Sequence, residues 1–533
     1  MNDIPRTFIY RLFEIFPGAI SWLIIIMPIV ASVWFPRAVA IFITLYIVLW
    51  FLRSLKLSFF LVYAYKKYKK YKKENWMHLL KFFSGDPPAA LAKIEKKTAS
   101  RISDLKKCGQ FKKWEALRHV AIIATYKEEK EILESTISGI TGSDFPLEKI
   151  IIVLAIEERD RERAQKNADY LKQKFNGVFG GFISFMHPAN IAGEVAGKGP
   201  NISWSGIKIA EVFKNQNIDF SNVIVTTLDA DNRPHKKYFS NLAYHYLMEF
   251  NRNKRTYQPV PFSSKNIWEV PVFSRLVALA STFWQLEQSA ETTYLRNFSA
   301  QAQSLDALVA TDFWSRQTID EDGHQFWRSY FAFYGKHKVV PLFLPIYHDA
   351  VQNRTYFLTL KSQYIQTRRW AWGASDIPYV ILKMWKEKSR LPFFKSLVLI
   401  YQLIEGHIMW STAPIIITLT NLIPSLFNKE FNRTVFAYNL NQVFSTIFTL
   451  ALIGILVSIW VSFLTLPPHP RGKKWTFLSM LQWVALPIIT IFFGAIPALD
   501  AQTRLMLNKP LQFVVTEKIR KTGACAHKIF TDG

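Results

Sequence analysis

Five long apolar stretches divide the chain, two near its beginning and three near its end. They cover residues 19–35, 38–51, 406–427, 443–466 and 477–496. A single Pro-Arg pair separates the first two, which predicts a helical hairpin, and each of the last three is about long enough to cross a bilayer. Mostly polar residues, from about 75 to 395, lie between the two groups. The pattern therefore predicts a soluble domain inserted between membrane segments.

Within the polar part, short β-branched runs alternate with amphipathic helical patterns. The runs lie at 119–125, 148–156, 180–188 and 222–228. This alternation predicts an α/β domain with a parallel sheet, right-handed crossovers and helices on both faces. Ligands of such sheets bind beyond the carboxyl ends of the strands, so candidate chemistry is sought there.

The formal charge of +26 is concentrated rather than evenly spread. Residues Lys66 to Arg118 contain sixteen Lys or Arg against five acids. Because this segment follows the predicted hairpin, we interpret it as a juxtamembrane region that faces anionic membrane lipids, and we expect no nucleic-acid partner. The first apolar stretch is longer than the core of a signal peptide, so we interpret it as an anchor. Cys108 and Cys525 are the only cysteines, which excludes a disulfide framework and a zinc quartet.

The membrane topology predicted from these stretches contains a conflict. Five crossings, with the soluble domain in the cytoplasm, would place the basic residues that follow position 500 on the outer side. Positive residues favour the cytoplasmic side. Either one of the late stretches is re-entrant, or a long one is split at a proline, and both alternatives stay open.

The fourth β-branched run ends on Asp229 and Asp231, with one alanine between them. In an extended chain, residues two apart point the same way, so the two carboxylates would repel each other. A hard divalent cation such as Mg²⁺ removes that repulsion and completes its coordination with water and phosphate oxygens. Lys198, in a glycine-flanked segment, is suited to a phosphate, and Gly199 excludes a Walker A loop, which needs Ser or Thr there. The alternative is an ordinary turn, since Asp, Asn and Pro all favour turns.

A second acidic group stands at the start of a predicted helix. It consists of Asp320, Glu321 and Asp322, and acids at this position also serve as ordinary caps. His324 follows closely, and we expect it to cap the helix rather than to tune a carboxylate.

A cationic and aromatic cluster follows at 364–376. It contains Gln366, Arg368, Arg369 and Trp370. These side chains suit a charged leaving group and a stacked ring. The alternative is a basic amphipathic helix at the membrane surface.

Taken in order, the motifs are Thr-Tyr-Lys-Glu after the first run, Asp-x-Asp, Glu-Asp and Gln-x-x-Arg-Trp. This set resembles the membrane-embedded family-2 glycosyltransferases, the group that contains the cellulose and hyaluronan synthases. Residues 497–518 are similar to the interfacial helix and the Phe-x-Val-Thr-x-Lys gating segment of the cellulose synthases. The resemblance covers roughly 115–375 plus this tail. It implies a GT-A fold, Rossmann-like with a parallel sheet, in the cytoplasm, a nucleotide-diphosphate sugar donor, and a single displacement that inverts the anomeric carbon.

By position, the resemblance assigns the donor side of the site. Thr125, Tyr126 and Glu128 would border the nucleoside, and Lys198 would meet the diphosphate of a donor that we expect to be a UDP-sugar. After the second strand this chain reads Ala-Ile-Glu-Glu-Arg-Asp, where the family usually has Asp-Asp or Asp-Gly. Glu157 or the glutamate after it therefore has to substitute.

The resemblance also assigns the metal and the base. Asp229 would contact both the nucleotide and a Mg²⁺ or Mn²⁺ ion, and Asp231 would coordinate that ion. Asp322, seconded by Glu321, would be the general base for the acceptor hydroxyl. The residues that would hold the leaving diphosphate and the acceptor sugar are Gln366, Arg369 and Trp370. The acceptor-side segment at 299–314 departs from the usual family pattern, so a growing glycan and a lipid-linked acceptor both stay open.

These expectations divide the chain into five parts. They are a transmembrane hairpin at 1–65, a basic linker at 66–114, a GT-A domain at 115–395, transmembrane helices at 396–496, and an interfacial helix with a cytoplasmic tail at 497–533. The predicted function is that of an integral membrane glycosyltransferase, in a bacterial inner membrane, that extends a glycan as polysaccharide synthases do. The alternatives are a single-transfer enzyme with a lipid-linked acceptor and, from another class, an inactive transporter or scaffold. An accessory subunit is left open.

Overall fold

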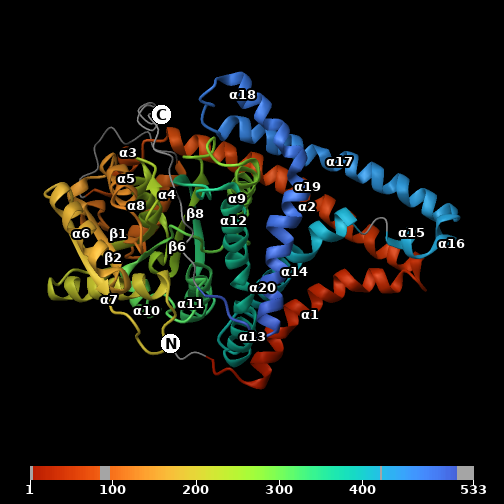
Figure 1. Cartoon of the computed structure of the whole chain (residues 1–533). Coiled ribbons are helices and arrows are strands. Elements are labelled where there is room, and N and C mark those ends of the chain that lie inside the picture. Colours follow the sequence, from red (N-terminus) through yellow and green to blue (C-terminus); the bar gives the residue numbers. More distant parts are fainter. Residues whose placement is uncertain (1–3, 85–95, 420–422, 513–533) are drawn as a thin grey trace.

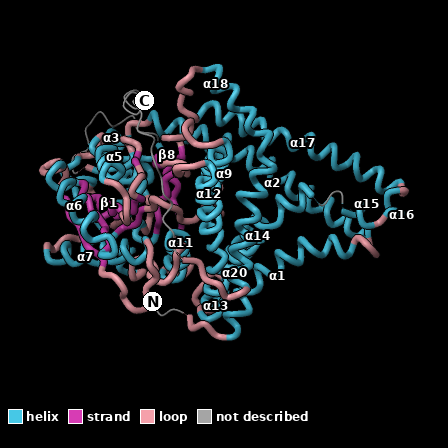
Figure 2. Tube along the Cα trace, in the orientation of Figure 1, coloured by secondary structure: helices cyan, strands magenta, loops and turns pink. Residues whose placement is uncertain are grey.

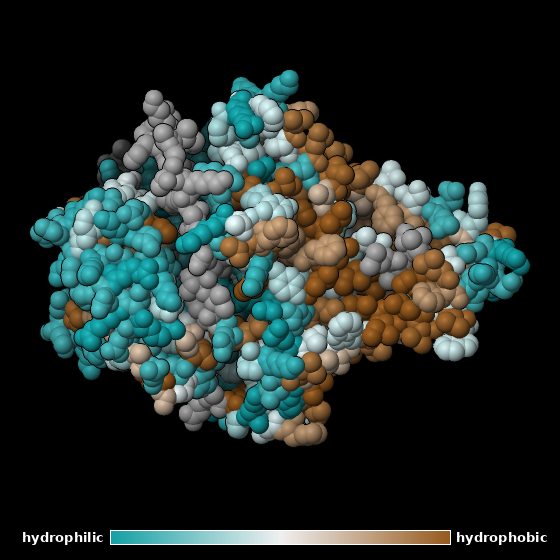
Figure 3. Space-filling model, viewed as in Figure 1, coloured by the Kyte–Doolittle hydropathy of each residue, from teal (hydrophilic) through white to brown (hydrophobic). Residues whose placement is uncertain are grey.

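The computed structural model describes residues 4–84, 96–419 and 423–512. An α/β part and a set of long helices lie next to each other (Figure 1, Figure 2). Hydrophilic residues dominate the visible face of the α/β part, whereas apolar residues cover much of the helical part (Figure 3). The gating-like segment at 513–518 lies outside the described residues.

In the described part of the chain, eight strands form one sheet in the order β3-β2-β1-β4-β7-β6-β8-β5. In chain order they are β1 Arg118–Ala124, β2 Ile150–Glu157, β3 Gly181–His187, β4 Val223–Asp229, β5 Arg233–Pro234, β6 Arg255–Ser263, β7 Ala302–Ser304 and β8 Lys338–His348. The first four run parallel, because β1 pairs with β2 and β4, and β2 pairs with β3. Their crossover helices are α5 Lys130–Thr141, α6 Arg161–Lys174 and α7 Lys198–Asn215. The predicted alternation of strand and helix is confirmed over this half.

The sheet as a whole is mixed, which corrects the expectation of a parallel sheet. β7 pairs antiparallel with both β4 and β6, and β5 pairs antiparallel with β8. β7 is three residues long and follows a loop rather than a crossover helix, so nothing forces it to run parallel. The remaining helices of this part are α3 Trp76–Leu80, α4 Lys96–Lys107, α8 Tyr238–Met248, α9 Val272–Ala290, α10 Leu305–Ala310, α11 Glu321–Ala332, α12 Tyr356–Ala371 and α13 Asp376–Lys386.

Two apolar cores lie on opposite faces of the parallel strands. Ala121 and Ile123 of β1 belong to the core that α5, α6 and α8 cover. Val120 and Ile122 belong to the other core, which α7 and α10 cover. This alternation is the two-residue period of a strand, and it explains why β1 and β2 read as continuous apolar runs.

Among the residues that the structure describes, four helical segments are long and apolar enough to cross a membrane. They are α1 Phe8–Ala31, α2 Pro36–Lys73, α17 Val435–Thr465, and the segment Lys473–Met506. α1 and α2 match the predicted hairpin, although α2 continues through the basic residues 66–73 and stacks Tyr68 on Phe262 of β6 at 5.2 Å. The predicted stretch 406–427 falls on α14 Phe393–Leu419 and the short α15 Ile423–Phe427, and α16 Lys429–Asn432 follows.

A buried histidine makes the fold sensitive to acid. His119 is the second residue of β1, and its ring packs against Phe145 and Phe239. Neither ring nitrogen has a hydrogen-bond partner in the described part of the chain. Burial lowers the pKa of His119 to about 3, against about 6.5 in an unfolded chain. Below pH 6.5 the unfolded chain binds a proton that the folded chain does not, so this group costs about 2 kcal/mol of stability at pH 5.

We expect His119→Leu to remove this cost. Thermal unfolding of the detergent-solubilised protein at pH 7 and pH 5 measures the effect. The variant should lose less stability than the native chain between the two pH values, and an equal loss in both proteins would contradict the assignment.

Candidate active site

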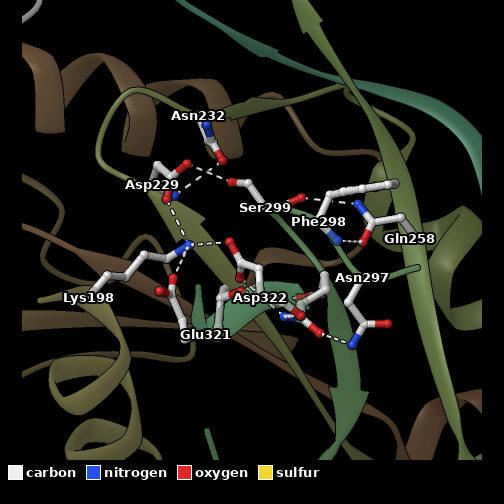
Figure 4. A network of polar contacts seen from close by, with 11 residues as sticks. Lys198, Asp229, Asn232, Gln258, Asn297, Phe298, Ser299, Glu321 and Asp322 are labelled. Carbon is white, nitrogen blue, oxygen red and sulfur yellow. Dashed lines mark hydrogen bonds and ion pairs between the residues drawn. The ribbon is translucent and has the colours of Figure 1, made fainter. Parts of the chain in front are cut away.

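The ammonium group of Lys198 lies among three carboxylates. Its Nζ is 2.9 Å from Asp229 Oδ1, 3.1 Å from Asp322 Oδ2 and 3.3 Å from Glu321 Oε1. All three acidic side chains point toward it (Figure 4). Burial alone would lower the pKa of Lys198, but the three carboxylates together raise it well above its ordinary value. Lys198 is therefore a fixed positive charge at this position.

Three element ends bring these groups together. Asp229 is the last residue of β4, Lys198 is the first residue of α7, and Glu321 is the first residue of α11. Gly199 lets the two helices begin close to each other, because a Cβ there would lie 2.5 Å from the Ser315 carbonyl oxygen and 3.1 Å from Glu321 Cβ. The glycine in this segment thus has a packing reason that the sequence alone did not reveal.

The cluster is open on one side. The Asp229 side chain is 38% exposed and that of Asp322 is 19% exposed, whereas Lys198 and Glu321 are more deeply buried. Burial raises the pKa of Glu321, and the neighbouring Asp322 carboxylate raises it further. A ligand can therefore reach Asp229 and Asp322, and Glu321 forms the base of the cluster.

Ser299 and Gln301 complete the cluster, and the sequence analysis missed both. Ser299 Oγ donates to Asp229 Oδ2 at 2.6 Å, and Gln301 Nε2 donates to Asp322 Oδ1 at 3.1 Å. Only one feature of the sequence pointed toward these two residues. Both lie at the beginning of the segment 299–314, which departs from the usual family pattern.

Asp231 lies near this cluster, but the described hydrogen bond of its carboxylate is to a residue outside the cluster. β4 ends at Asp229, and Asp231 follows in a turn, where its Oδ2 accepts a hydrogen bond from the Asp349 amide at 3.0 Å. The strand alternation that was expected to align the two aspartates therefore stops before Asp231. Among the described residues, no group of three His, Cys, Asp or Glu side chains forms a metal site. Two nearby carboxylates nevertheless fit a Mg²⁺ or Mn²⁺ ion that arrives with a nucleotide, because phosphate oxygens and water supply its other ligands.

A second group lies at the carboxyl ends of β1 and β2. Thr125 Oγ1 donates to a Glu128 carboxylate oxygen at 2.9 Å. Arg159 places its guanidinium carbon 4.4 Å from the centre of the Tyr126 ring, and its Nε donates to Glu157 at 2.8 Å. Burial raises the pKa of Glu128 to about 7, and the charge of Asp231 adds to the shift, which links this group to the first. No sequence motif pointed to Arg159.

The Gln-x-x-Arg-Trp motif lies on α12. Burial and the neighbouring acids raise the pKa of Asp320 well above its ordinary value, and the charge of Arg369, on this helix, only partly opposes that rise. Gln366 contacts Gln363 on the same helix at 3.5 Å, and the Trp370 side chain is 39% exposed. The charge of Arg369 therefore acts on the acidic group, and the binding roles of Gln366, Arg369 and Trp370 stay predictions.

His324 does not cap α11 with its side chain, contrary to expectation. Its Nδ1 lies 2.6 Å from Asp376 Oδ1 at the start of α13, and both side chains are buried. The sequence could not reveal this pair, because the two residues are 52 positions apart.

Comparisons with known proteins add little to this geometry. No protein-family model matches the chain, and no curated protein matches it in sequence. Among solved structures, the mannosyltransferase PcManGT from Pyrobaculum calidifontis, in complex with GDP-Man and Mn²⁺, aligns with 10% identity and a TM-score of 0.35, over 84% of this chain and 99% of that one. GalNAc-T7 with UDP, GalNAc and Mn²⁺ aligns with 12% identity and a TM-score of 0.32, over 55% of this chain and 58% of that one.

Staphylococcus aureus TarS, residues 1–349 with UDP-GlcNAc, aligns with 11% identity and a TM-score of 0.30, over 61% of this chain and 92% of that one. Overlaps of this size do not establish a common fold.

Proposed function

We propose that the chain is a membrane-bound glycosyltransferase with a GT-A-like catalytic domain, similar to the family-2 enzymes. It would transfer a sugar from a nucleotide-diphosphate sugar to a growing glycan, with inversion at the anomeric carbon. One observation carries the proposal: the Lys198 ammonium lies within 3.3 Å of the last residue of β4 and of both acids that begin α11. A diphosphate bound at Lys198 would therefore lie next to the proposed base.

The positive charge of Lys198 suits the diphosphate of the donor. An ammonium is a compact charge with three donors, and it stabilises the leaving group as negative charge grows on it. A Mg²⁺ or Mn²⁺ ion bound with the nucleotide would be held by Asp229 and Asp231 and would neutralise part of the same charge. Thr125, Tyr126, Glu128 and Glu157 would border the nucleoside.

Asp322 is the proposed general base. The acceptor oxygen forms a bond to the anomeric carbon, the bond from that carbon to the diphosphate oxygen breaks, and the hydroxyl proton passes to Asp322. The raised pKa of Glu321 favours its protonated form, which makes Glu321 the weaker candidate for the base. A carboxylate needs only hydrogen-bond reach and an unprotonated state to serve in this way.

Turnover of sugar nucleotides tests the proposal. The purified protein in detergent is incubated with a panel of UDP-, GDP- and other nucleotide sugars, with Mg²⁺ or Mn²⁺, and release of the nucleoside diphosphate is measured. One donor should be consumed, and both EDTA and Asp231→Ala should stop the reaction. Binding of a sugar nucleotide without turnover would instead favour an inactive scaffold.

Product size separates polymer synthesis from single transfer. The Phe-x-Val-Thr-x-Lys motif at 513–518 favours a polysaccharide synthase. A ladder or smear of products on a gel would agree with that assignment, whereas one product of fixed size on a lipid-linked acceptor would replace it.

Gln301 is expected to orient the base. Gln301→Leu removes a hydrogen bond to a charged carboxylate, which contributes about 1.5–3 kcal/mol. We expect kcat to fall by about 10- to 100-fold with the donor KM nearly unchanged. The kinetic constants of the variant measure the effect, and Gln165→Leu, on the exposed surface of α6, is the matched control. A rise in KM with an unchanged kcat would assign Gln301 to binding instead.

A further inference from the structure

The helical segment from Lys473 to Met506 contacts the α/β part along most of its length. Trp483 stacks on Phe283 of α9, with ring centres 5.9 Å apart, and Phe493 stacks on Phe273 of the same helix at 5.0 Å. Seven residues further on, Asp500 accepts a hydrogen bond from Arg368 of α12 at 2.8 Å. α9 itself packs on β6 and β8, so these contacts are made with the body of the α/β domain.

The spacing of these contacts excludes an ordinary crossing. The stretch contains the end of a 3-10 segment, Ser479–Ala485, and a π segment, Ile491–Ala495. As a straight α-helix, the residues from Trp483 to Asp500 would rise about 26 Å, which is close to the thickness of the hydrocarbon layer of about 30 Å. The helical segment has only ten residues before Trp483 and six after Asp500, too few on either side to cross the bilayer. This segment instead stays against the domain over a length that would span the bilayer, and in Figure 1 it passes beside α9 and α12 and across the direction of α1 and α17.

The outer face of the segment is apolar and exposed. It consists of Phe477 at 72% exposure, Leu481 at 64%, Val484 at 82%, Ile488 at 62% and Phe492 at 56%. These residues recur every three or four positions, which places them on one stripe of a helix. An exposed apolar patch of this kind marks a surface that binds a partner or a membrane.

Basic and aromatic residues mark the start of the segment. Arg471, Lys473 and Lys474 are exposed, and the Arg471 guanidinium carbon lies 5.2 Å from the centre of the Trp475 ring. Trp268 and His469 contact each other beside it, with ring centres 4.7 Å apart. Clustered positive charges match anionic headgroups, and tryptophans favour the boundary between headgroups and acyl chains. In Figure 3, the apolar residues that cover the helical part border directly on the hydrophilic α/β part.

We propose that the segment 473–506 lies in the plane of the membrane on the side of the catalytic domain and does not cross. Its apolar stripe rests in the boundary between headgroups and acyl chains, and the basic residues before the stripe contact anionic phospholipids. The crossings are then α1, α2 and α17, with α14, which carries most of the predicted apolar stretch 406–427, as the fourth. All four run toward the end of the molecule where α15 and α16 lie (Figure 1). With this even number of crossings, Arg504 and Lys509 lie on the side of the catalytic domain, which resolves the charge conflict of a five-span topology.

Cysteine labelling tests this topology. With Cys108 and Cys525 replaced by serine, single cysteines at Asp169, Arg433 and Lys509 are treated with a membrane-impermeant maleimide in intact cells and in inverted vesicles. We expect Lys509→Cys to react with the same sidedness as Asp169→Cys, in the catalytic domain, and with the opposite sidedness to Arg433→Cys. Reaction of Lys509→Cys and Arg433→Cys from the same side would overturn the proposal.

Depth measurements give a second test, independent of labelling sidedness. Nitroxides are attached at Phe477→Cys, Val484→Cys and Phe492→Cys, and the protein is placed in phosphatidylcholine vesicles with and without phosphatidylglycerol. An in-plane segment gives similar shallow depths at all three positions, whereas a crossing helix gives depths that differ by about 22 Å from first to last. The anionic lipid should draw the position nearest the basic residues, 477, closer to the headgroups, and Arg471→Gln with Lys473→Gln and Lys474→Gln should abolish that shift. A graded depth profile, or a shift that the charge variants leave unchanged, would contradict the proposal.

Discussion

Replacing Asp322 with asparagine is expected to lower kcat for sugar transfer by about 10³-fold, because general base catalysis contributes about 10²- to 10⁴-fold. The amide is nearly isosteric, and it keeps an oxygen that can accept from Gln301 Nε2, 3.1 Å from Asp322 Oδ1 in the native chain. The donor dissociation constant should therefore change little. Nucleoside diphosphate release under saturating donor and acceptor measures kcat, and equilibrium binding of the nucleoside diphosphate measures the donor site.

Asp169→Asn is the matched control for this variant. Asp169 lies on the exposed surface of α6, where it accepts a hydrogen bond from Gln165. The Asp169→Asn variant should retain full activity. If Asp322→Asn kept more than about a tenth of the native kcat, the base would have to be another residue, and Glu321→Gln would be the next variant to measure.

Replacing Lys198 with methionine is expected to weaken binding of the nucleoside diphosphate by about 100-fold. A charge-assisted hydrogen bond contributes about 1.5–3 kcal/mol, and this variant also leaves three carboxylates near the diphosphate without their cation. Affinity for the free nucleoside should stay nearly unchanged, because that group would bind at the ends of β1 and β2. Titration calorimetry with both ligands separates the two effects.

The same helix supplies the control. Lys208 is exposed on α7 and pairs with Glu211 at 2.8 Å, so Lys208→Met removes an equal charge without touching the cluster. Equal losses for the nucleoside and the nucleoside diphosphate in Lys198→Met would indicate a distorted fold rather than a lost phosphate contact.

The parallel half of the sheet could be predicted because its signal is local. Strands buried on both faces read as short, continuous β-branched runs, and each run from β1 to β4 is separated from the next by one helix. β7 gave no such signal, because three residues carry no periodicity. The mixed character of the sheet was therefore missed.

The sequence motifs named several of the residues that the structure brings together, but they did not reveal the contacts between them. Lys198 and Asp322 are 124 positions apart in the chain, and nothing in the sequence states that an ammonium group joins them. Ser299 and Gln301 belong to no motif, and they reach Asp229 and Asp322 only because β7 inserts beside β4. Hydrophobicity also could not show whether residues 473–506 cross the membrane or lie along it. An apolar helix that crosses a bilayer and one that lies along its surface have similar composition.

The central claim is that Lys198, together with a metal ion that Asp229 would help to hold, binds the departing diphosphate, and that Asp322 faces the sugar. A cryo-electron microscopy structure of the protein with Mn²⁺ and the nucleoside diphosphate of its preferred donor tests it most directly. The account predicts phosphate density within hydrogen-bond distance of Lys198 Nζ, with the nucleoside at the ends of β1 and β2. Density for the nucleotide in another cleft, with Lys198 still bound to its three carboxylates, would contradict it.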